Sequence, residues 1–385
     1  MPVSYLFPAV LTRFANGTSA KFVLARLGFL VQNVLLAVAI AVAGRRASLR
    51  WNALVVAGIV VSVTPVFLWQ VGLIAPNSTE NLALIAFATA LAAAVHQPQS
   101  RWWCVAALLV APATWTRDLG FFYVPSIVVL LLASSHGRKL VQQLPRARQT
   151  VIGAAVASAS LAGFLWRLAY NSPTPSVDLS AHSIWLRVAR LRTLSIDAIG
   201  RVGILNIPTQ SVVTVVWPIV FVIVWGLLAA RSRHWARVVT SAVLYWAGVN
   251  IVLNLVISAK GFTWFGTQAR YTSFVPVVFL VLGLATEPHE RIENRAGGPL
   301  TDRAVLWAAS IVASLCHFIT FIHVHHRWAN GLAHPLALRH SSWSPPGGWA
   351  LGVAMSAAAT LMILLAPLWF PAGEKRRAST SERST

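Results

Sequence analysis

The chain contains about eleven apolar stretches, each close to the roughly 20 residues that one α-helix needs to cross a bilayer core about 30 Å thick. Hydrophobic residues make up 57% of the sequence and charged residues only 11%, which is far from the balance of a water-soluble domain. The sequence therefore predicts an all-α, polytopic bundle of transmembrane helices. The predicted spans are 25–44, 53–74, 81–96, 102–116, 119–135, 151–170, 212–230, 237–258, 272–286, 304–323 and 349–370.

The basic residues predict the orientation of this bundle. They gather in alternate loops, which the positive-inside rule places in the cytoplasm, so the N-terminus is outside and the C-terminus is cytoplasmic. The net charge of +21 is explained by loops that face anionic headgroups, and we expect no nucleic-acid partner. The predicted cytoplasmic cations are Arg45, Arg46, Arg50, Arg101, Arg138, Lys139, Arg146, Arg148, Arg231, Arg233, Arg237, Arg291, Arg295, Arg303, Lys375, Arg376, Arg377 and Arg383.

The N-terminal segment lacks the ordered basic, apolar and small-residue regions of a signal peptide. It predicts instead an interfacial helix whose apolar side chains, among them Tyr5, Phe7 and Phe14, face lipid. An odd number of spans with an exported N-terminus leads us to expect one further helix upstream of Met1 in the natural gene product or its ancestor.

We expect a single transmembrane domain over residues 1–370 and a disordered cytoplasmic tail at 371–385. The largest interruption is a predicted extracytoplasmic loop at 171–211. Within it, apolar residues recur at helical spacing beside Trp185, while Arg187 and Arg190 fall elsewhere on the helical wheel. This pattern predicts a basic amphipathic helix in the outer interface, which either binds an anionic lipid-linked substrate or only anchors to headgroups.

Acidic residues are few, so carboxylate chemistry has a short set of candidates. We interpret those among the cytoplasmic arginines as solvated loop charges; they are Glu287, Glu290, Glu293, Asp302, Glu374 and Glu382. The exported side holds Glu80, Asp118, Asp178 and Asp197. Any acid–base or carboxylate–metal chemistry outside the membrane would draw on these residues.

Glu80 and Asp118 are the catalytic candidates. Glu80 follows an Asn-Ser-Thr cluster at the start of the third span, where a carboxylate also suits a helix N-terminus. Arg117 and Asp118 form a charged pair between two short spans, and charge at membrane depth is often functional. A wet hairpin tip is the alternative interpretation of this pair. The Arg117 guanidinium would suit a lipid phosphate.

Histidines gather near the outer end of the span 304–323. The imidazoles of His323, His325 and His326 are spaced so that they could converge on a divalent metal. They lack an accompanying carboxylate and a specific zinc spacing, so we interpret them as interfacial histidines and assign no metal. Cys104 and Cys316 both fall in apolar spans and indicate no disulfide framework.

Several segments occur together in the order and spacing of a known family. They are APNSTENLALIAFATALAA, TRDLGFFYVPSIVVLLL, IGRVGILNIPTQSVVTVVW and GTQARYTSFVP. Over roughly residues 1–285 the chain thereby resembles domain-of-unknown-function family 2142. That family consists of polytopic bacterial membrane proteins similar to C-type membrane glycosyltransferases.

The resemblance implies a protein of the bacterial plasma membrane that acts on a polyprenyl-phosphate-linked sugar at the outer leaflet. In such an enzyme arginines would stabilise the leaving phosphate. The residues that the resemblance suggests for binding phosphate or lipid are Arg117, Lys260, Gln268, Arg270 and Tyr271. A divalent metal cofactor is implied by the resemblance alone.

The chain departs from the family's pattern in ways that bear on activity. Asp118 stands where the family usually has proline, and Asn206 where it usually has aspartate, so a carboxylate is lost. The family also resembles C-type transferases in opening with a helix and an acidic outer loop, and this chain begins after that loop. We therefore expect a truncated or inactive transferase, and favour phosphate or lipid binding over catalysis.

Two other functions stay open. A transporter or lipid flippase would need polar residues lining several spans, and the spans offer few. Asn250 and Asn254 share a helix face, which predicts hydrogen bonds across the bundle. A non-catalytic scaffold of an envelope-assembly complex would need no active site.

Overall fold

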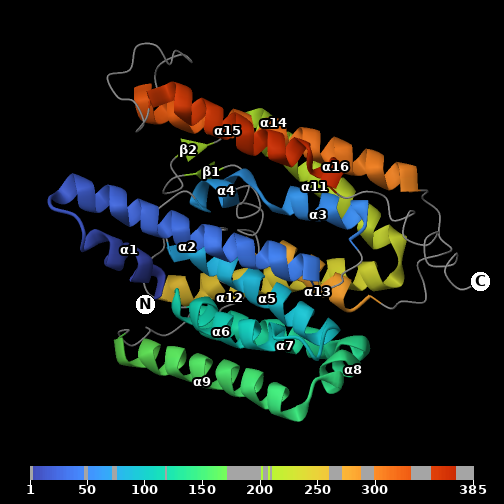
Figure 1. Cartoon of the computed structure of the whole chain (residues 1–385). Coiled ribbons are helices and arrows are strands. Elements are labelled where there is room, and N and C mark those ends of the chain that lie inside the picture. Colours follow the sequence, from blue (N-terminus) through green and yellow to red (C-terminus); the bar gives the residue numbers. More distant parts are fainter. Residues whose placement is uncertain are drawn as a thin grey trace, which may run out of the picture. The chain divides into compact units, whose positions relative to one another are not determined.

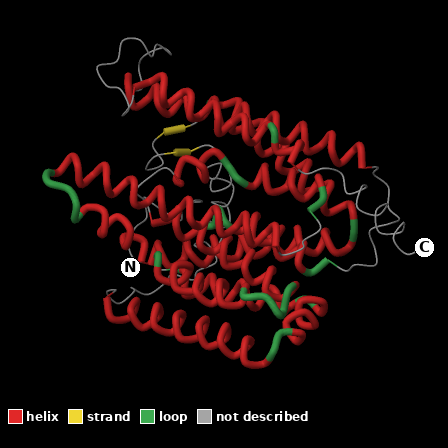
Figure 2. The backbone as a smooth tube through the Cα atoms, in the orientation of Figure 1, coloured by secondary structure: helices red, strands yellow, loops and turns green. Residues whose placement is uncertain are grey.

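The computed structural model describes residues 3–46, 51–71, 76–117, 119–170, 201–202, 207–208, 210–259, 271–287, 299–330 and 348–369. The described backbone is almost entirely helical, as Figures 1 and 2 show, which confirms the all-α prediction. Its only strands are the two-residue β1 (Arg201–Val202) and β2 (Ile207–Pro208), which pair antiparallel. The helices are η1 (Val3–Tyr5), α1 (Leu6–Thr12), α2 (Thr18–Arg46), α3 (Ala53–Ser62), α4 (Pro65–Val71), α5 (Pro76–His96), α6 (Trp102–Trp115), α7 (Gly120–Ala133), α8 (Ser135–Gln143), α9 (Arg146–Tyr170), α11 (Ser211–Arg231), α12 (Arg233–Ala259), α13 (Val275–Ala285), α14 (Pro299–Asn330), α15 (Gly348–Leu364) and α16 (Ala366–Trp369).

Six of the described helices are long and apolar enough to cross a membrane, or up to seven if the bent pair α7–α8 counts as one span. The six are α2, α5, α9, α11, α12 and α14. Every other predicted span coincides with a shorter apolar helix or an interrupted helix, namely α3–α4, α6, α7, α13 and α15–α16. The helical membrane bundle is thus confirmed, whereas the count of about eleven spans and the orientation stay predictions.

The chain divides into two compact units, which we describe separately. Unit 1 comprises Met1–Leu49, Phe67–Leu194 and Thr240–Arg291, and unit 2 comprises Arg50–Val66, Ser195–Val239 and Ile292–Thr385. The expectation of one transmembrane domain over 1–370 stays a prediction. Most of the 171–211 loop, with its predicted interfacial helix, and the 371–385 tail lie outside the described residues.

Helix α5 forms the core of unit 1. Every residue from Asn77 to Val95 is buried, and α2, α6 and α13 pack around the helix. Its second half is rich in alanine, and small side chains let the backbones of neighbouring membrane helices approach closely. The sequence of α5 therefore suits a helix surrounded by protein rather than by lipid.

In the N-terminal segment α1 packs along α2, and the preceding turn η1 contacts α5 and α6. Pro8 is buried, while Tyr5, Phe7 and Phe14 are exposed. Exposed aromatic side chains on a helix outside the core are what the predicted contact with lipid requires. The interfacial position itself stays a prediction.

Unit 2 is built from α3, α11, α14 and α15, which pack on one another (Figure 1). Its buried apolar centre joins Val213 and Trp217 of α11 to Ala313 and Cys316 of α14. The outward face of α11 carries exposed apolar residues such as Val222, which fits a helix that faces lipid.

The helical segment of unit 2 that precedes Pro65 is interrupted. Proline has no N–H, so the carbonyl of Val61 lacks the partner that an unbroken helix would give it. The indole Nε1 of Trp217 donates to this carbonyl over 3.0 Å. The His317 imidazole hydrogen-bonds to the backbone of Val63, whose own N–H already donates to Ile59, so the carbonyl is the acceptor. Two side chains from other helices thus complete the interrupted backbone.

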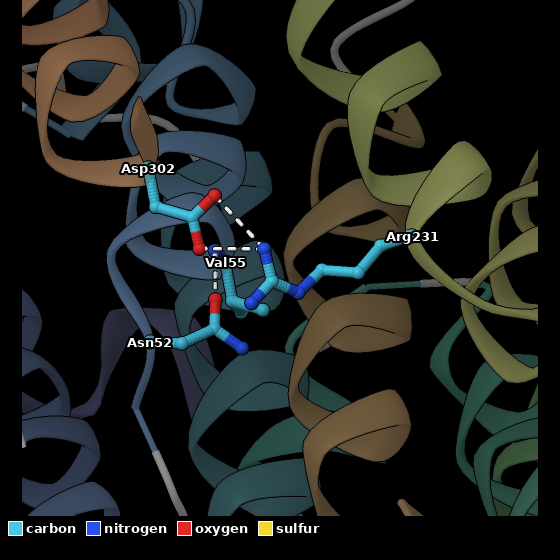
Figure 3. Close-up of polar contacts among 4 residues, drawn as sticks. All are labelled: Asn52, Val55, Arg231 and Asp302. Atoms are coloured by element: carbon cyan, nitrogen blue, oxygen red, sulfur yellow. Dashed lines mark hydrogen bonds and ion pairs between the residues drawn. The ribbon is translucent and has the colours of Figure 1, made fainter. Parts of the chain in front are cut away.

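An ion pair joins the end of α11 to the start of α14 in unit 2 (Figure 3). Arg231 Nη1 donates to both carboxylate oxygens of Asp302, over 2.9 and 2.6 Å. Nearby, Asn52 Oδ1 accepts from the Val55 N–H over 2.8 Å and caps α3 (Figure 3). The interpretation of Asp302 as a solvated loop charge is therefore wrong, because the residue is only 9% exposed and its ion pair links α14 to α11.

Candidate functional site

The first turns of α5 hold an unbroken run of buried polar side chains. Residues Asn77 to Asn81 are each at most 6% exposed, and Glu80 is 1% exposed. The sequence predicts this span from residue 81, but α5 begins at Pro76, so the polar run lies inside the helix. Proline suits a helix start because its missing N–H would have no partner there. A set of polar groups is thereby placed inside unit 1.

Asn33 of α2 meets this run. It is 1% exposed; its Nδ2 donates to Ser78 Oγ over 3.3 Å, and its Oδ1 accepts from Thr79 Oγ1 over 2.9 Å. A buried amide without partners would be costly in an apolar interior. These two bonds therefore fix the register of α2 against α5.

Arg117 lies in the short connection between α6 and α7. The connection is tight because a Cβ on Gly120 would come within 2.2 Å of the Ala113 carbonyl oxygen, so only glycine allows this approach. The half-buried guanidinium donates from Nη1 to Asn77 Oδ1. It also lies 3.8 Å from the centroid of the Tyr271 ring, a close cation–π contact. Asn77 and Tyr271 thus hold the cation from two sides.

Tyr123 of α7 extends the site into the interior. Its side chain is fully buried, and its hydroxyl is within electrostatic range of the Glu80 carboxylate and the Arg117 guanidinium. Within the described part of the chain this hydroxyl has no hydrogen-bond partner. Buried hydroxyls without a partner are uncommon in native proteins, so a polar group that reached Tyr123 would be stabilised there.

The segment that carries Tyr271 is held by two contacts. Asn250 of α12, which is fully buried, donates from Nδ2 to Thr272 Oγ1 over 3.1 Å. Phe274 packs edge-on against Tyr123, with ring centroids 4.8 Å apart. The hydrogen bond across the bundle that the sequence predicts for Asn250 is thus present, and it positions the residue next to Tyr271.

We call the polar side chains around the start of α5, together with the Tyr271 ring that holds Arg117, the α5 polar cluster. Its members are Asn33, Asn77, Ser78, Thr79, Glu80, Asn81, Arg117, Tyr123 and Tyr271. Three of them, Glu80, Arg117 and Tyr271, are site candidates that the sequence supplies from three separate segments. The structure brings these three to one site. Other candidates lie outside the described residues; they are Asp118, Trp185, Arg187, Arg190, Lys260, Gln268 and Arg270.

Sequence reasoning does not assign Asn33 or Tyr123 to the site. For Asn33 a signal exists, because an amide inside a long apolar span must find a partner in the bundle. Tyr123 has no such signal, because it lies in an apolar run and its nearness to Glu80 and Arg117 follows only from the folded structure.

The histidines of α14 in unit 2 are engaged separately. Gln210 Nε2 donates to His323 Nδ1 over 2.8 Å, and His325 Nδ1 hydrogen-bonds to the Phe321 carbonyl over 2.9 Å. His326 is buried. In the described ranges no three His, Cys, Asp or Glu side chains are placed to hold a metal ion together. These contacts give the first two histidines hydrogen-bonding roles within unit 2.

Comparison with protein families places part of the chain in a family model. The family model described as dolichyl-phosphate-mannose-protein mannosyltransferase matches residues 2–169, somewhat less than half of the chain. This stretch includes every member of the α5 polar cluster except Tyr271. Comparisons with curated proteins and with solved structures give no match.

The chain is therefore a multi-pass membrane protein with a glycosyltransferase-like region at residues 2–169. The match supports the glycosyltransferase part of the resemblance drawn from the sequence. The more particular resemblance to domain-of-unknown-function family 2142 stays a prediction.

Proposed function

We propose that this protein binds a polyprenyl-phosphate-linked sugar at the outer leaflet of a bacterial plasma membrane, with Arg117 receiving the phosphate. The observation that carries the proposal is the half-buried guanidinium held between Asn77 and the Tyr271 ring. The family match over residues 2–169 supports glycosyl transfer as the reaction class. Arg117 lies within that match.

The surroundings of Arg117 favour a phosphate as its partner. Arginine is weakly hydrated and presents several N–H donors in one plane, which fits two phosphate oxygens at once. Within the described residues the printed contacts of Arg117 are a neutral amide and an aromatic ring rather than a carboxylate. Because the site is partly buried, attraction between opposite charges is stronger than in water.

Transfer of a sugar would also need a group that accepts the proton of the acceptor hydroxyl. Glu80 is the carboxylate of the α5 polar cluster, one turn along the helix from Asn77. We propose Glu80 as that base, with Asp118 as the alternative that the sequence supplies. A protein in which neither carboxylate acts would bind the lipid-linked sugar without transferring it.

The proposal is tested by binding of a polyprenyl-phosphate sugar to the full chain reconstituted in lipid nanodiscs. We expect Arg117→Ala to weaken binding by about 10- to 150-fold, since a hydrogen bond to a charged group contributes about 1.5–3 kcal/mol. Arg117→Lys keeps the charge but loses the planar donors, and should recover only part of the affinity. Arg13→Gln, which removes an exposed cation outside the cluster, is the matched control.

Equal affinities of the unmodified protein and Arg117→Ala would contradict the proposal. Sugar transfer from the same donor to a lipid or peptide acceptor is then measured with Glu80→Gln. Loss of transfer with binding retained supports Glu80 as the base. Binding without transfer in the unmodified protein would instead favour a non-catalytic role.

A further inference from the structure

Helix α8 turns away from α7 by 102°, and the turn is built by specific contacts. Ser134 Oγ accepts from the Gly137 N–H over 2.8 Å and caps the start of α8. Arg138 Nη1 donates to the carbonyls of Leu132 and Ala133, over 3.0 and 3.3 Å, at the end of α7. Both helix ends at the bend are therefore satisfied by side chains.

The bend depends on glycine at position 137. A Cβ there would lie 2.0 Å from the Leu131 carbonyl oxygen, a distance that no other residue could adopt without moving the backbone. Leu140 of α8 and Leu144, directly after the helix, are buried, while Arg138 and Lys139 are exposed. Helix α8 is thus a docked amphipathic helix with a basic outer face.

The direction of α8 indicates where this face lies. Helix α7 is apolar, and α7 and α8 together are long and apolar enough to form one bent membrane span. A helix at nearly a right angle to a spanning helix runs along the membrane surface, where an amphipathic helix places its polar face among the headgroups. The exposed side chain of Lys139 would then lie in the headgroup layer.

Further cations are tied to the same end of unit 1 by hydrogen bonds. Gln97 Nε2 donates to the Arg46 carbonyl, and Arg148 Nη1 donates to the Pro98 carbonyl. The Arg148 guanidinium also lies 5.7 Å from the Trp103 ring. These contacts join the end of α2, the α5–α6 connection and the start of α9. We call the cations gathered there the basic end of unit 1; they are Arg45, Arg46, Arg101, Arg138, Lys139, Arg146 and Arg148.

Among the described residues, this end holds many more basic than acidic side chains. The segments 97–101 and 134–150 contain no acidic residue. Glu287 is the one carboxylate described near this end of unit 1, two residues after Ala285, whose carbonyl contacts His96 Nε2 at 3.0 Å. Exposed arginines and lysines beside a membrane surface attract anionic lipids, and this attraction falls off within a Debye length.

We propose that the basic end of unit 1 is a binding site for anionic phospholipid headgroups, with α8 as the element that lies in the headgroup layer. Charge complementarity indicates the occupant, because a group of mostly exposed cations on a membrane protein attracts phosphate headgroups. This site is distinct from the α5 polar cluster in its residues and in its ligand, a bulk phospholipid rather than a lipid-linked sugar.

The test measures phosphatidylglycerol binding by the full chain in phosphatidylcholine nanodiscs, read as retained lipid by native mass spectrometry. We expect the double variant Lys139→Gln, Arg146→Gln to bind about 25-fold more weakly, about fivefold for each removed charge. The matched control is Arg13→Gln, Lys21→Gln, which removes two exposed cations from the N-terminal segment and the start of α2. Raising the salt to about 1 M should abolish the difference.

A second variant separates geometry from net charge. Gly137→Ala keeps every cation but obstructs the bend, and we expect it to lower phosphatidylglycerol binding while polyprenyl-phosphate binding is retained. Equal loss in the double variant and its control would overturn the proposal, because net charge alone would then explain binding. Unchanged binding in the Lys139→Gln, Arg146→Gln protein would overturn it as well.

Discussion

Both units bury polar side chains among apolar helices, but these side chains have different partners. In unit 2, Trp217 and His317 satisfy backbone carbonyls that the interruption before Pro65 leaves open. In unit 1, helix α5 is unbroken, and Asn33 and Arg117 contact other polar side chains of the cluster. The unit 2 side chains hydrogen-bond to backbone carbonyls of an interrupted helix. The unit 1 side chains hydrogen-bond to one another, and the backbone of α5 does not need them.

This difference separates structural from functional polarity inside a membrane protein. A buried donor matched to a carbonyl that proline has deprived of its partner is explained by folding alone. A half-buried cation and a buried carboxylate that both act on a hydroxyl without a partner among the described residues are not explained in that way. Such groups in membrane proteins are commonly functional. Variants that remove one polar group from each unit should therefore behave differently.

The largest effect is expected at Trp217. Trp217→Phe removes the donor to the Val61 carbonyl and shrinks a buried ring, and should lower the free energy of unfolding by about 2–4 kcal/mol. Trp225→Phe is the matched control, because Trp225 is also a buried residue of α11, and its Nε1 has no partner among the described residues. It should cost about 1 kcal/mol. Equal losses in thermal unfolding would show that the hydrogen bond to Val61 contributes nothing.

The ion pair of unit 2 should have the next largest effect. Asp302→Asn leaves the Arg231 charge without its counter-ion at a site where the two side chains are only 12% and 26% exposed. Because solvent partly screens the ion pair, we expect a loss of only about 1–2 kcal/mol in the free energy of unfolding. The exposed neighbour Arg303→Gln should stay within about 0.5 kcal/mol. A stable Asp302→Asn protein would show that α11 and α14 do not need this pair.

Tyr123→Phe tests unit 1, where we expect weaker ligand binding and almost no loss of stability. The hydroxyl has no hydrogen-bond partner in the described residues, so its removal should change the unfolding free energy by less than about 0.5 kcal/mol. Binding of the polyprenyl-phosphate sugar should fall by about two- to tenfold, the effect of one lost neutral hydrogen bond. Destabilisation with unchanged binding would instead assign Tyr123 a folding role.

The smallest effect on ligand binding is expected at Asn250. Asn250→Ala removes the bond to Thr272 and should cost about 0.6 kcal/mol, the average for hydrogen bonds between membrane helices. Because Thr272 follows Tyr271, affinity for the lipid-linked sugar should fall slightly as well. Val252→Ala, at an exposed position of the same helix, should leave that affinity unchanged. The comparison of units would be weakened if Asn250→Ala altered stability only.

The sequence was sufficient to predict the membrane class and the positions of the helices, because apolar length is a local property of the chain. It was insufficient for the start of α5, since the run from Asn77 to Glu80 is as polar as a loop. Asn33 and Arg117, which are distant in sequence, provide the partners that let this run enter the helix. Helix boundaries set by tertiary partners have no local signal.

The same reasoning explains the other differences. Helix α8 lies in a segment that the sequence assigns to a cytoplasmic loop, because a short amphipathic helix lacks the length of a span. The pairing of Arg117 with Tyr271 joins two motifs of the family resemblance, and the distance of 3.8 Å between them could not be derived from either motif. The burial of Asp302 likewise depends on Arg231 of another helix.

The interrupted segment before Pro65 constrains how the protein is made. The Val61 carbonyl and its donor, Trp217, are 156 residues apart. At a synthesis rate of about 5–20 residues per second, the carbonyl enters the membrane roughly 8–30 s before its donor exists. During that interval the nascent segment needs shelter from lipid at the insertion machinery or from water molecules. A late helix thus determines when an early one can be released into the bilayer.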